Sequence, residues 1–351
     1  MTRRSPLSRR TFIKLTATVA AGAALASCSP KQIPTTPTEA ATAIKPTTPP
    51  SPTSGLVSTD TSPAETSPTE TTSNPEPTQA TSPAYLAVIH GPDPAAITRA
   101  AIEALGGMES FVSSGYDVII KPNICTDYHP PEYATTTNPT VVGTLVSLCL
   151  EAGAKRVRVM DYPFGGTARS AYEISGIAEA VEAAGGEMHV MNQAKYVVVE
   201  IPQGRDITSV EIYPDILEAD LLINVPIAKD HGSTRLTLGG KNLMGVILDR
   251  GMMHFNLSQR IADLTSLVLP ALTVIDAVRI LTNHGPTGGD LADVQQKDTI
   301  IASRDIVAAD AYATTLFGLT GSDIGYIQAS AEMGLGSMDL SSMDIREVTL
   351  G

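Results

Sequence analysis

The chain has 351 residues and a formal net charge of −13, with 42% hydrophobic residues, 4% aromatic residues and no Trp. This length allows two domains or one large α/β domain. The acidity excludes nucleic acid as an expected partner, because phosphates require a basic surface. Residues 1–83 hold 13 of the 25 Pro, with 7 basic and 5 acidic residues. Residues 84–351 therefore carry 17 basic and 32 acidic residues, a net charge of −15.

Residues 1–28 have the features of an export signal. Ser8-Arg9-Arg10-Thr11-Phe12-Ile13-Lys14 resembles the twin-arginine signal, and a weakly apolar stretch from Leu15 to Leu25 follows it. This stretch is too short to span a bilayer, which takes roughly 20 apolar residues, but it suits a signal peptide. Leu25-Ala26-Ser27-Cys28 resembles a lipobox, in which Cys28 is lipidated. We therefore expect export by the twin-arginine route and a lipid anchor on the outer face of the cytoplasmic membrane.

Residues 29–83 form a low-complexity segment, in which 35 of 55 residues are Pro, Thr or Ser. Such a composition cannot bury enough apolar surface to offset its chain entropy. Its prolines favour extended conformations, so we expect a disordered stalk that holds residues 84–351 away from the membrane.

From Tyr85 onward, short apolar runs alternate with helical patterns. We predict strands at Tyr85–His90, Asp117–Ile124, Arg156–Asp161, Glu187–Met191, Val197–Ile201, Val210–Tyr213, Asp220–Val225, Leu272–Asp276 and Thr299–Ala302. We predict helices at Pro94–Leu105, Pro139–Ala152, Ala168–Ala184, Leu257–Leu269 and Ile306–Phe317. This order predicts a single layered α/β domain over residues 84–351, with a mostly parallel sheet flanked by helices. The runs at 197–201 and 210–213 predict a small β-hairpin insertion.

A series of short motifs resembles the domain-of-unknown-function family 362 over roughly residues 85–335. The motifs are Lys121-Pro122-Asn123, Asn138-Pro139, Gly153-Ala154-Lys155, Asp161, Pro226-Ile227-Ala228-Lys229-Asp230-His231, Thr237, Lys241-Asn242-Leu243-Met244-Gly245, His254, Asp276, Gly285-Pro286-Thr287-Gly288 and Ala302-Ser303-Arg304-Asp305. Many relatives resemble iron–sulfur proteins, whose clusters usually have four thiolate ligands. Here only Cys125 and Cys149 follow Cys28, so we do not expect a cluster held by this chain alone. We expect both thiols to be free, although an exported protein allows a disulfide.

Ligands of parallel sheets bind beyond the carboxyl ends of the strands, where several predicted strands here lead into polar turns. Residues 226–256 are rich in cationic and imidazole side chains, which include Lys229, His231, Arg235, Lys241 and His254. Lysine and asparagine side chains that converge there can bind a phosphate or carboxylate. The expected anion-binding residues are Lys121, Asn123, Lys229, Lys241 and Asn242. The alternative is that these cations pair with the surplus Asp and Glu.

His231, His254 and Asp276 are the candidate catalytic residues. In one hypothesis they bind Zn, Fe or Mn, with His129 and His284 as further candidates, although none lies in a compact metal motif. In another, a histidine acts as acid or base, Asp276 orients it, and Lys241 polarises a bound oxyanion.

Two classes of function remain open. The first is a membrane-anchored enzyme, redox-linked or metal-assisted, that acts on a small anionic substrate. The second is a non-catalytic ligand-binding lipoprotein or an accessory subunit of a membrane complex. The sequence identifies neither a cofactor nor a protein partner.

Overall fold

Ten strands form one mixed sheet in the computed structural model, which describes residues 85–351. The signal and stalk predicted over 1–83 lie outside the described residues. The main path of the sheet runs β12-β1-β11-β10-β7-β2-β3-β4, and β8 joins β10 to β9. The strands of this sheet are β1 (Leu86–His90), β2 (Asp117–Pro122), β3 (Arg156–Val159), β4 (Glu187–Met188), β7 (Leu221–Val225), β8 (Ile227–His231), β9 (Arg235–Thr237), β10 (Leu272–Leu281), β11 (Val294–Ser303) and β12 (Ile345–Thr349).

Most neighbouring strands are parallel. β2 pairs in parallel with both β3 and β7, and β7 pairs in parallel with β10. β11 is antiparallel to its neighbours β1 and β10, and β9 is antiparallel to β8. A separate antiparallel pair, β5 (Val197–Glu200) with β6 (Ser209–Ile212), is the predicted hairpin insertion. The expected layered α/β fold is therefore confirmed.

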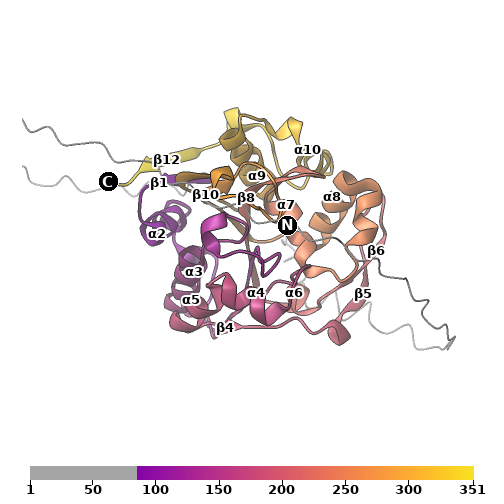
Figure 1. Ribbon diagram of the computed structural model, residues 1–351, viewed down its shortest axis with the longest axis horizontal. Coiled ribbons are helices and arrows are strands. Elements are labelled where there is room, and N and C mark those ends of the chain that lie inside the picture. Colours follow the sequence, from indigo (N-terminus) through magenta and orange to yellow (C-terminus); the bar gives the residue numbers. More distant parts are fainter. Residues whose placement is uncertain (1–84) are drawn as a thin grey trace, which may run out of the picture. The chain divides into compact units, whose positions relative to one another are not determined.

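Helices cover both faces of the sheet. They are α2 (Pro94–Ala104), α3 (Pro139–Glu151), α4 (Ala168–Ile174), α5 (Ile177–Ala183), α6 (Asp215–Glu218), α7 (Gly239–Asn242), α8 (Leu257–Val268), α9 (Ile306–Thr314) and α10 (Gly325–Glu332). In Figure 1, α2, α3 and α5 lie together on the left, whereas α8, α9 and α10 lie in the upper and right part.

Alternation along the strands divides the apolar residues between two cores. Val118 and Ile120 of β2 belong to the core that contains α2, α3, α4 and α5. Ile119 belongs to the core that contains α8, α9 and α10. A strand segment covered on both faces is mostly apolar, which explains the unbroken run Val118-Ile119-Ile120.

Side-chain caps begin several helices at the ends of strands. The Asn138 side chain accepts a hydrogen bond from the Thr140 N–H, and Pro139 occupies the first helical position of α3. Thr167 and Ser170 form a capping box at the start of α4. Such caps satisfy backbone groups that the first helical turn leaves unpaired.

Several element predictions were wrong in detail. The helix predicted over Ala168–Ala184 is two helices, because Gly176 takes a left-handed conformation between them with φ of 69°. The strand predicted to end at Asp276 continues to Leu281. The prediction missed β8, β9, β12 and α10, and placed no helix at α7, whose four residues include two glycines.

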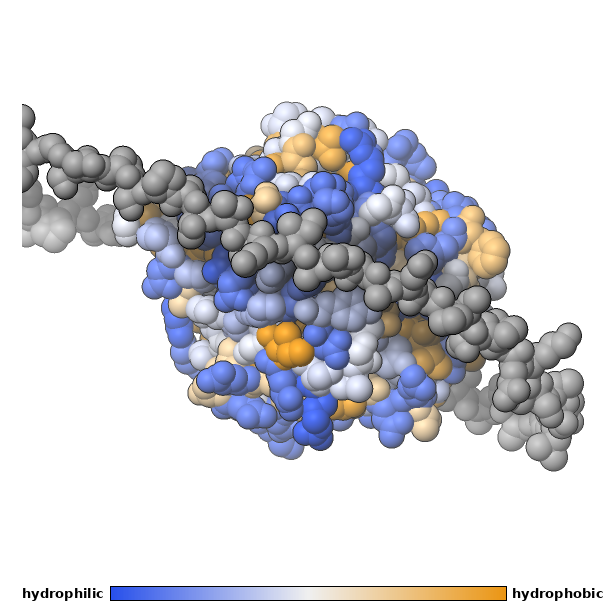
Figure 2. All heavy atoms as spheres, in the orientation of Figure 1, coloured by the Kyte–Doolittle hydropathy of each residue, from blue (hydrophilic) through white to orange (hydrophobic). Residues whose placement is uncertain are grey.

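The surface visible in Figure 2 is mostly hydrophilic where described residues are coloured, and its apolar residues form small separate patches. Within residues 85–351, no helix is both long and apolar enough to cross a membrane.

Candidate functional site

Polar residues from three elements converge on one pocket of about 60 Å³ beyond the carboxyl ends of the central strands. β2 provides Lys121, β8 provides Lys229 and His231, and α7 provides Lys241 and Asn242. The remaining lining residues are Asn123, Cys125, Asp161, Tyr162, Phe164, Thr237, Met244, Gly245, Arg250 and Pro286. The structure thus brings all five expected anion-binding residues to one pocket.

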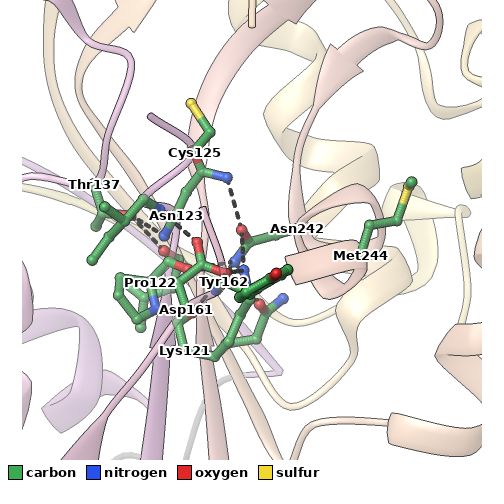
Figure 3. Close-up of polar contacts among 12 residues, drawn as sticks. Lys121, Pro122, Asn123, Cys125, Thr137, Asp161, Tyr162, Asn242 and Met244 are labelled. Atoms are coloured by element: carbon green, nitrogen blue, oxygen red, sulfur yellow. Dashed lines mark hydrogen bonds and ion pairs between the residues drawn. The ribbon is translucent and has the colours of Figure 1, made fainter. Parts of the chain in front are cut away.

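One wall of the pocket is a buried polar network (Figure 3). The Nζ of Lys121 lies 2.9 Å from Asp161 Oδ1 and donates a hydrogen bond of 2.8 Å to Asn242 Oδ1. The Asn123 side chain donates to the same Asn242 oxygen over 2.9 Å. Burial lowers the pKa of Lys121 to about 8, although the nearby Asp161 charge opposes this shift. Asn242 therefore fixes two neighbours through a single oxygen.

Gly245 allows this network to approach the backbone. A Cβ at Gly245 would lie 2.0 Å from Asp161 Oδ1 and 2.5 Å from Lys121 Nζ. These distances are far below van der Waals contact, so only glycine fits here.

Lys229 is completely buried and bound by neutral acceptors. Its Nζ donates to the Thr135 carbonyl over 2.6 Å and to the Pro286 carbonyl over 2.9 Å. The Cys125 sulfur lies 3.3 Å from the same nitrogen. These contacts hold the ammonium but do not neutralise it.

Lys241 differs from the other pocket cations because it has no hydrogen-bond or ion-pair partner among residues 85–351. Burial and the positive charges of Lys229, Arg250 and Lys121 lower its pKa to about 7. Near neutral pH its side chain is therefore divided between ammonium and free amine.

Arg250 is the fourth cation of the pocket. Its Nε donates to the Met244 carbonyl over 3.0 Å, and its guanidinium also donates to the Tyr162 carbonyl. Asp161 is the one carboxylate in the lining of this pocket, and Lys121 already pairs with it. The pocket is consequently cationic within a domain whose net charge is strongly negative.

His231 is neutral in this setting. Burial, followed by the charges of Lys241 and Lys229, lowers the pKa of His231 to about 3. Its Nδ1 lies 3.0 Å from the Ser233 backbone N–H, which donates to it. A neutral imidazole that accepts at Nδ1 carries its proton on Nε2, so His231 can donate a hydrogen bond from Nε2.

Two oxygens of the lining lack partners. Asn123 Oδ1 and Thr237 Oγ1 are buried and have no hydrogen-bond partner among the described residues. Buried polar atoms are usually paired, so these two could pair with water or a ligand.

The α7 turn that carries Lys241 is anchored from behind by Asp310 of α9. Its carboxylate accepts from the Gly239 N–H over 2.6 Å and from the Gly240 N–H over 2.9 Å. Complete burial raises the pKa of Asp310 to about 7.

The other two catalytic candidates do not line the pocket. Asp276 lies inside β10, where its carboxylate accepts from the Asn138 and Val278 N–H groups, and burial raises its pKa to about 6. The prediction placed Asp276 at a strand end, but the strand continues beyond it. His254 is exposed on a 3₁₀ turn. Asp276 therefore does not orient either histidine.

The structure does not assemble the predicted metal site. No group of three or more His, Cys, Asp or Glu side chains within residues 85–351 is placed to hold a metal ion. Of the further candidates, His129 stacks on Tyr133 at 4.3 Å between ring centroids. The exposed His284 lies 2.6 Å from Asp293, which raises the pKa of the imidazole.

Both described cysteines are free, as expected. Cys125 lines the pocket, whereas Cys149 is buried in α3, and that burial raises its pKa to about 12.

Three further residues of the site region, Asp161, Arg250 and Asp310, were not among the predicted site residues. Asp161 was recognised as part of the family motif series and as the last residue of a predicted strand, but its pairing with Lys121 was not predicted. Arg250 lies between the motif at 241–245 and His254 and was not itself among the expected anion-binding residues. Asp310 is a single acidic residue within an otherwise apolar helix, and this isolated charge was the signal that could have revealed it.

Residues 118–315 match the family model described as a domain of unknown function, DUF362. This range is more than half of the chain, and the protein belongs to that family. A thylakoid-associated protein of Synechocystis sp. is 28% identical over 255 residues, which cover 68% of this chain and 75% of that protein.

Two solved structures are similar to this chain at low sequence identity. The lactate racemase apoprotein of Thermoanaerobacterium thermosaccharolyticum has a TM-score of 0.42 and 13% identity, over 68% of this chain and 57% of that one. A protein of Thermotoga maritima has a TM-score of 0.43 and 14% identity, over 64% and 59%. This chain thus spans less than two thirds of either solved chain.

Proposed function

We propose that the domain binds a small anionic ligand, bearing a carboxylate or phosphate group, in the pocket between β2, β8 and α7. One observation carries this proposal: Lys121, Lys229, Lys241 and Arg250 share one pocket with a single carboxylate. Burying like charges together is unfavourable unless an opposite charge compensates them. A bound anion supplies that charge, and cationic donors form the stronger class of hydrogen bonds.

The pocket volume and the fixed positions of its cations both suit a small ligand. The pocket volume of about 60 Å³ leaves room for a few non-hydrogen atoms. Lys121, Lys229 and Arg250 are each held by protein acceptors, so their positions are fixed before a ligand arrives. Such preorganisation reduces the entropy lost on binding.

The binding test uses sulfate, a dianion that does not titrate near neutral pH, with the full-length protein and isothermal titration calorimetry. We expect saturable binding that weakens about tenfold or more in Lys241→Met, since hydrogen bonds to charged groups contribute about 1.5–3 kcal/mol. Lys155→Met changes the net charge of the protein by the same amount as Lys241→Met, but it removes an exposed lysine. It should leave the sulfate affinity unchanged. Equal losses in both variants would show that only the overall charge matters, and would contradict a defined pocket.

We further propose that the protein is exported by the twin-arginine route and anchored through Cys28 on the outer face of the cytoplasmic membrane. The order of Arg9-Arg10, an apolar stretch and Cys28 supports this proposal. Cys28→Ala should release the exported protein from the membrane fraction, whereas Ser29→Ala should not. Retention of Cys28→Ala in that fraction after a high-salt wash would contradict the anchor.

An enzyme is the second candidate, and Lys241 favours it. An amine with no partner within residues 85–351 and a pKa near neutrality is suited to proton transfer or nucleophilic attack. Sulfate has no electrophilic carbon, so we expect it to bind without reacting. The sulfate experiment therefore tests binding and not catalysis.

A further inference from the structure

Lys241 is a cation of the anion pocket and also has the properties of an amine nucleophile. Lys121 and Lys229 have their nitrogens committed to fixed acceptors, whereas the Lys241 nitrogen has none within the described chain. Its side chain is also only partly buried, so a ligand in the pocket can reach it.

The surroundings of Lys241 favour its reactive form. The positive charges of Lys229, Arg250 and Lys121 oppose its protonation, in addition to burial. A lysine that is desolvated near other cations is a better nucleophile, because more of it is free amine. The backbone beneath it is fixed, since Asp310 accepts from the two N–H groups that precede Lys241.

A reacting molecule must place a carbonyl carbon at Lys241 and a negative charge at the remaining cations. We propose that Lys241 forms an imine with the carbonyl carbon of a short 2-oxo acid, whose carboxylate accepts hydrogen bonds from Arg250 and is attracted by the positive charges of Lys121 and Lys229. This proposal rests on the anion-binding function proposed above. The pocket volume of about 60 Å³ restricts it to the shortest members of the class.

The chemistry balances without an added oxidant or reductant. The free amine attacks the carbonyl carbon and forms a C–N bond, while the C=O π electrons move to oxygen. Both amine protons leave with that oxygen as water, and the C=N bond forms. A proton from solvent then gives the cationic imine. The Nε2–H of His231 is a hydrogen-bond donor that can stabilise the developing oxyanion.

The test uses glyoxylate, the smallest 2-oxo acid, with the full-length protein at neutral pH. Sodium cyanoborohydride reduces an imine to a stable secondary amine, and peptide mass spectrometry then locates the adduct. We expect the adduct at Lys241, in excess over exposed lysines such as Lys155. Acetaldehyde, which has the same carbon skeleton without the carboxylate, should label Lys241 far less.

Lys241→Arg separates reaction from binding, because it keeps a cation but removes the amine. This variant should still bind sulfate, and glyoxylate should still compete with sulfate, while labelling at position 241 is lost. Labelling confined to exposed lysines, with glyoxylate still displacing sulfate from the unaltered protein, would overturn the imine and leave the anion pocket standing. Absence of sulfate and glyoxylate binding alike would overturn both proposals.

Discussion

The Nζ of Lys121 lies 2.9 Å from Oδ1 of Asp161, and both side chains are almost completely buried, with exposed fractions of 1% and 3%. This pair consumes the one carboxylate that lines the pocket. The charges of Lys229, Lys241 and Arg250 are therefore uncompensated by any carboxylate of the lining. The pair thus accounts for both the rigidity of one pocket wall and the cationic character of the rest.

Removing one partner should destabilise the protein strongly. Asp161→Asn leaves Lys121 buried without its counter-ion, and we expect the free energy of unfolding to fall by about 3–5 kcal/mol. Urea denaturation measures this change. Glu151→Gln is the control, because it breaks the exposed ion pair of Glu151 with Arg99. An exposed pair contributes at most about 1 kcal/mol to the free energy of unfolding.

The double variant Lys121→Met with Asp161→Asn separates charge from packing. It should be more stable than Asp161→Asn alone, because no lone buried ammonium remains. A double variant that loses the sum of the two single effects would show that the ion pair has no coupling energy.

Gly245→Ala tests the close approach of the backbone to this pair. The added Cβ would overlap Asp161 and Lys121, so we expect a loss of about 1–3 kcal/mol in stability and weaker sulfate binding. Gly232→Ala is the matched control, since a Cβ there meets no atom within 4 Å. Equal stability of the two variants would argue against the observed packing at Gly245.

The sequence was sufficient to predict the central strands and the grouping of the five expected anion-binding residues in one pocket. Buried parallel strands need apolar residues at every position, so Val118-Ile119-Ile120 could be recognised from composition alone. Lys121, Lys229 and Lys241 follow from the rule that ligands bind beyond the carboxyl ends of such strands. The rule applies only to parallel sheets, and the alternation of strands and helices along the chain predicts a mostly parallel sheet.

The position of Asp276 could not be predicted in the same way. Its burial depends on where β10 ends, and that end is set by eight residue pairs with β11 rather than by local residues. The missed strand β8 has a related cause. Its residues include Lys229, Asp230 and His231, which local propensity does not assign to a strand, and pairing with β9 and β10 overrides that propensity.

Sulfate affinity should fall as the pH rises from 6 to 9. Lys241, with a pKa of about 7, loses its charge first, and Lys121, with a pKa of about 8, follows. Deprotonation of Lys241 removes a charge-assisted hydrogen bond and deprotonation of Lys121 removes a positive charge, so the dissociation constant should rise about tenfold or more in total. Calorimetry at several pH values measures the profile.

Lys241→Met should remove the part of this profile centred near pH 7 and keep the part near pH 8. An unchanged profile in Lys241→Met would assign the pH dependence to another group. Lys155→Met should reproduce the profile of the unaltered protein.

His231 should make the protein less stable in acid. Its pKa is about 3 in the folded protein, against an ordinary value near 6.5, so between these values the unfolded chain binds a proton that the folded protein does not. The contribution of His231 to the free energy of unfolding is fully present above pH 6.5. It is lost as the pH falls, by at most about 1.4 kcal/mol per pH unit.

His231→Asn keeps an acceptor for the Ser233 N–H and should lose stability less steeply between pH 6 and 4 in urea denaturation. His284→Asn is the control, because Asp293 raises the pKa of the exposed His284, which places its effect above pH 6.5. Identical slopes for His231→Asn and the unaltered protein would show that His231 titrates normally in the folded state.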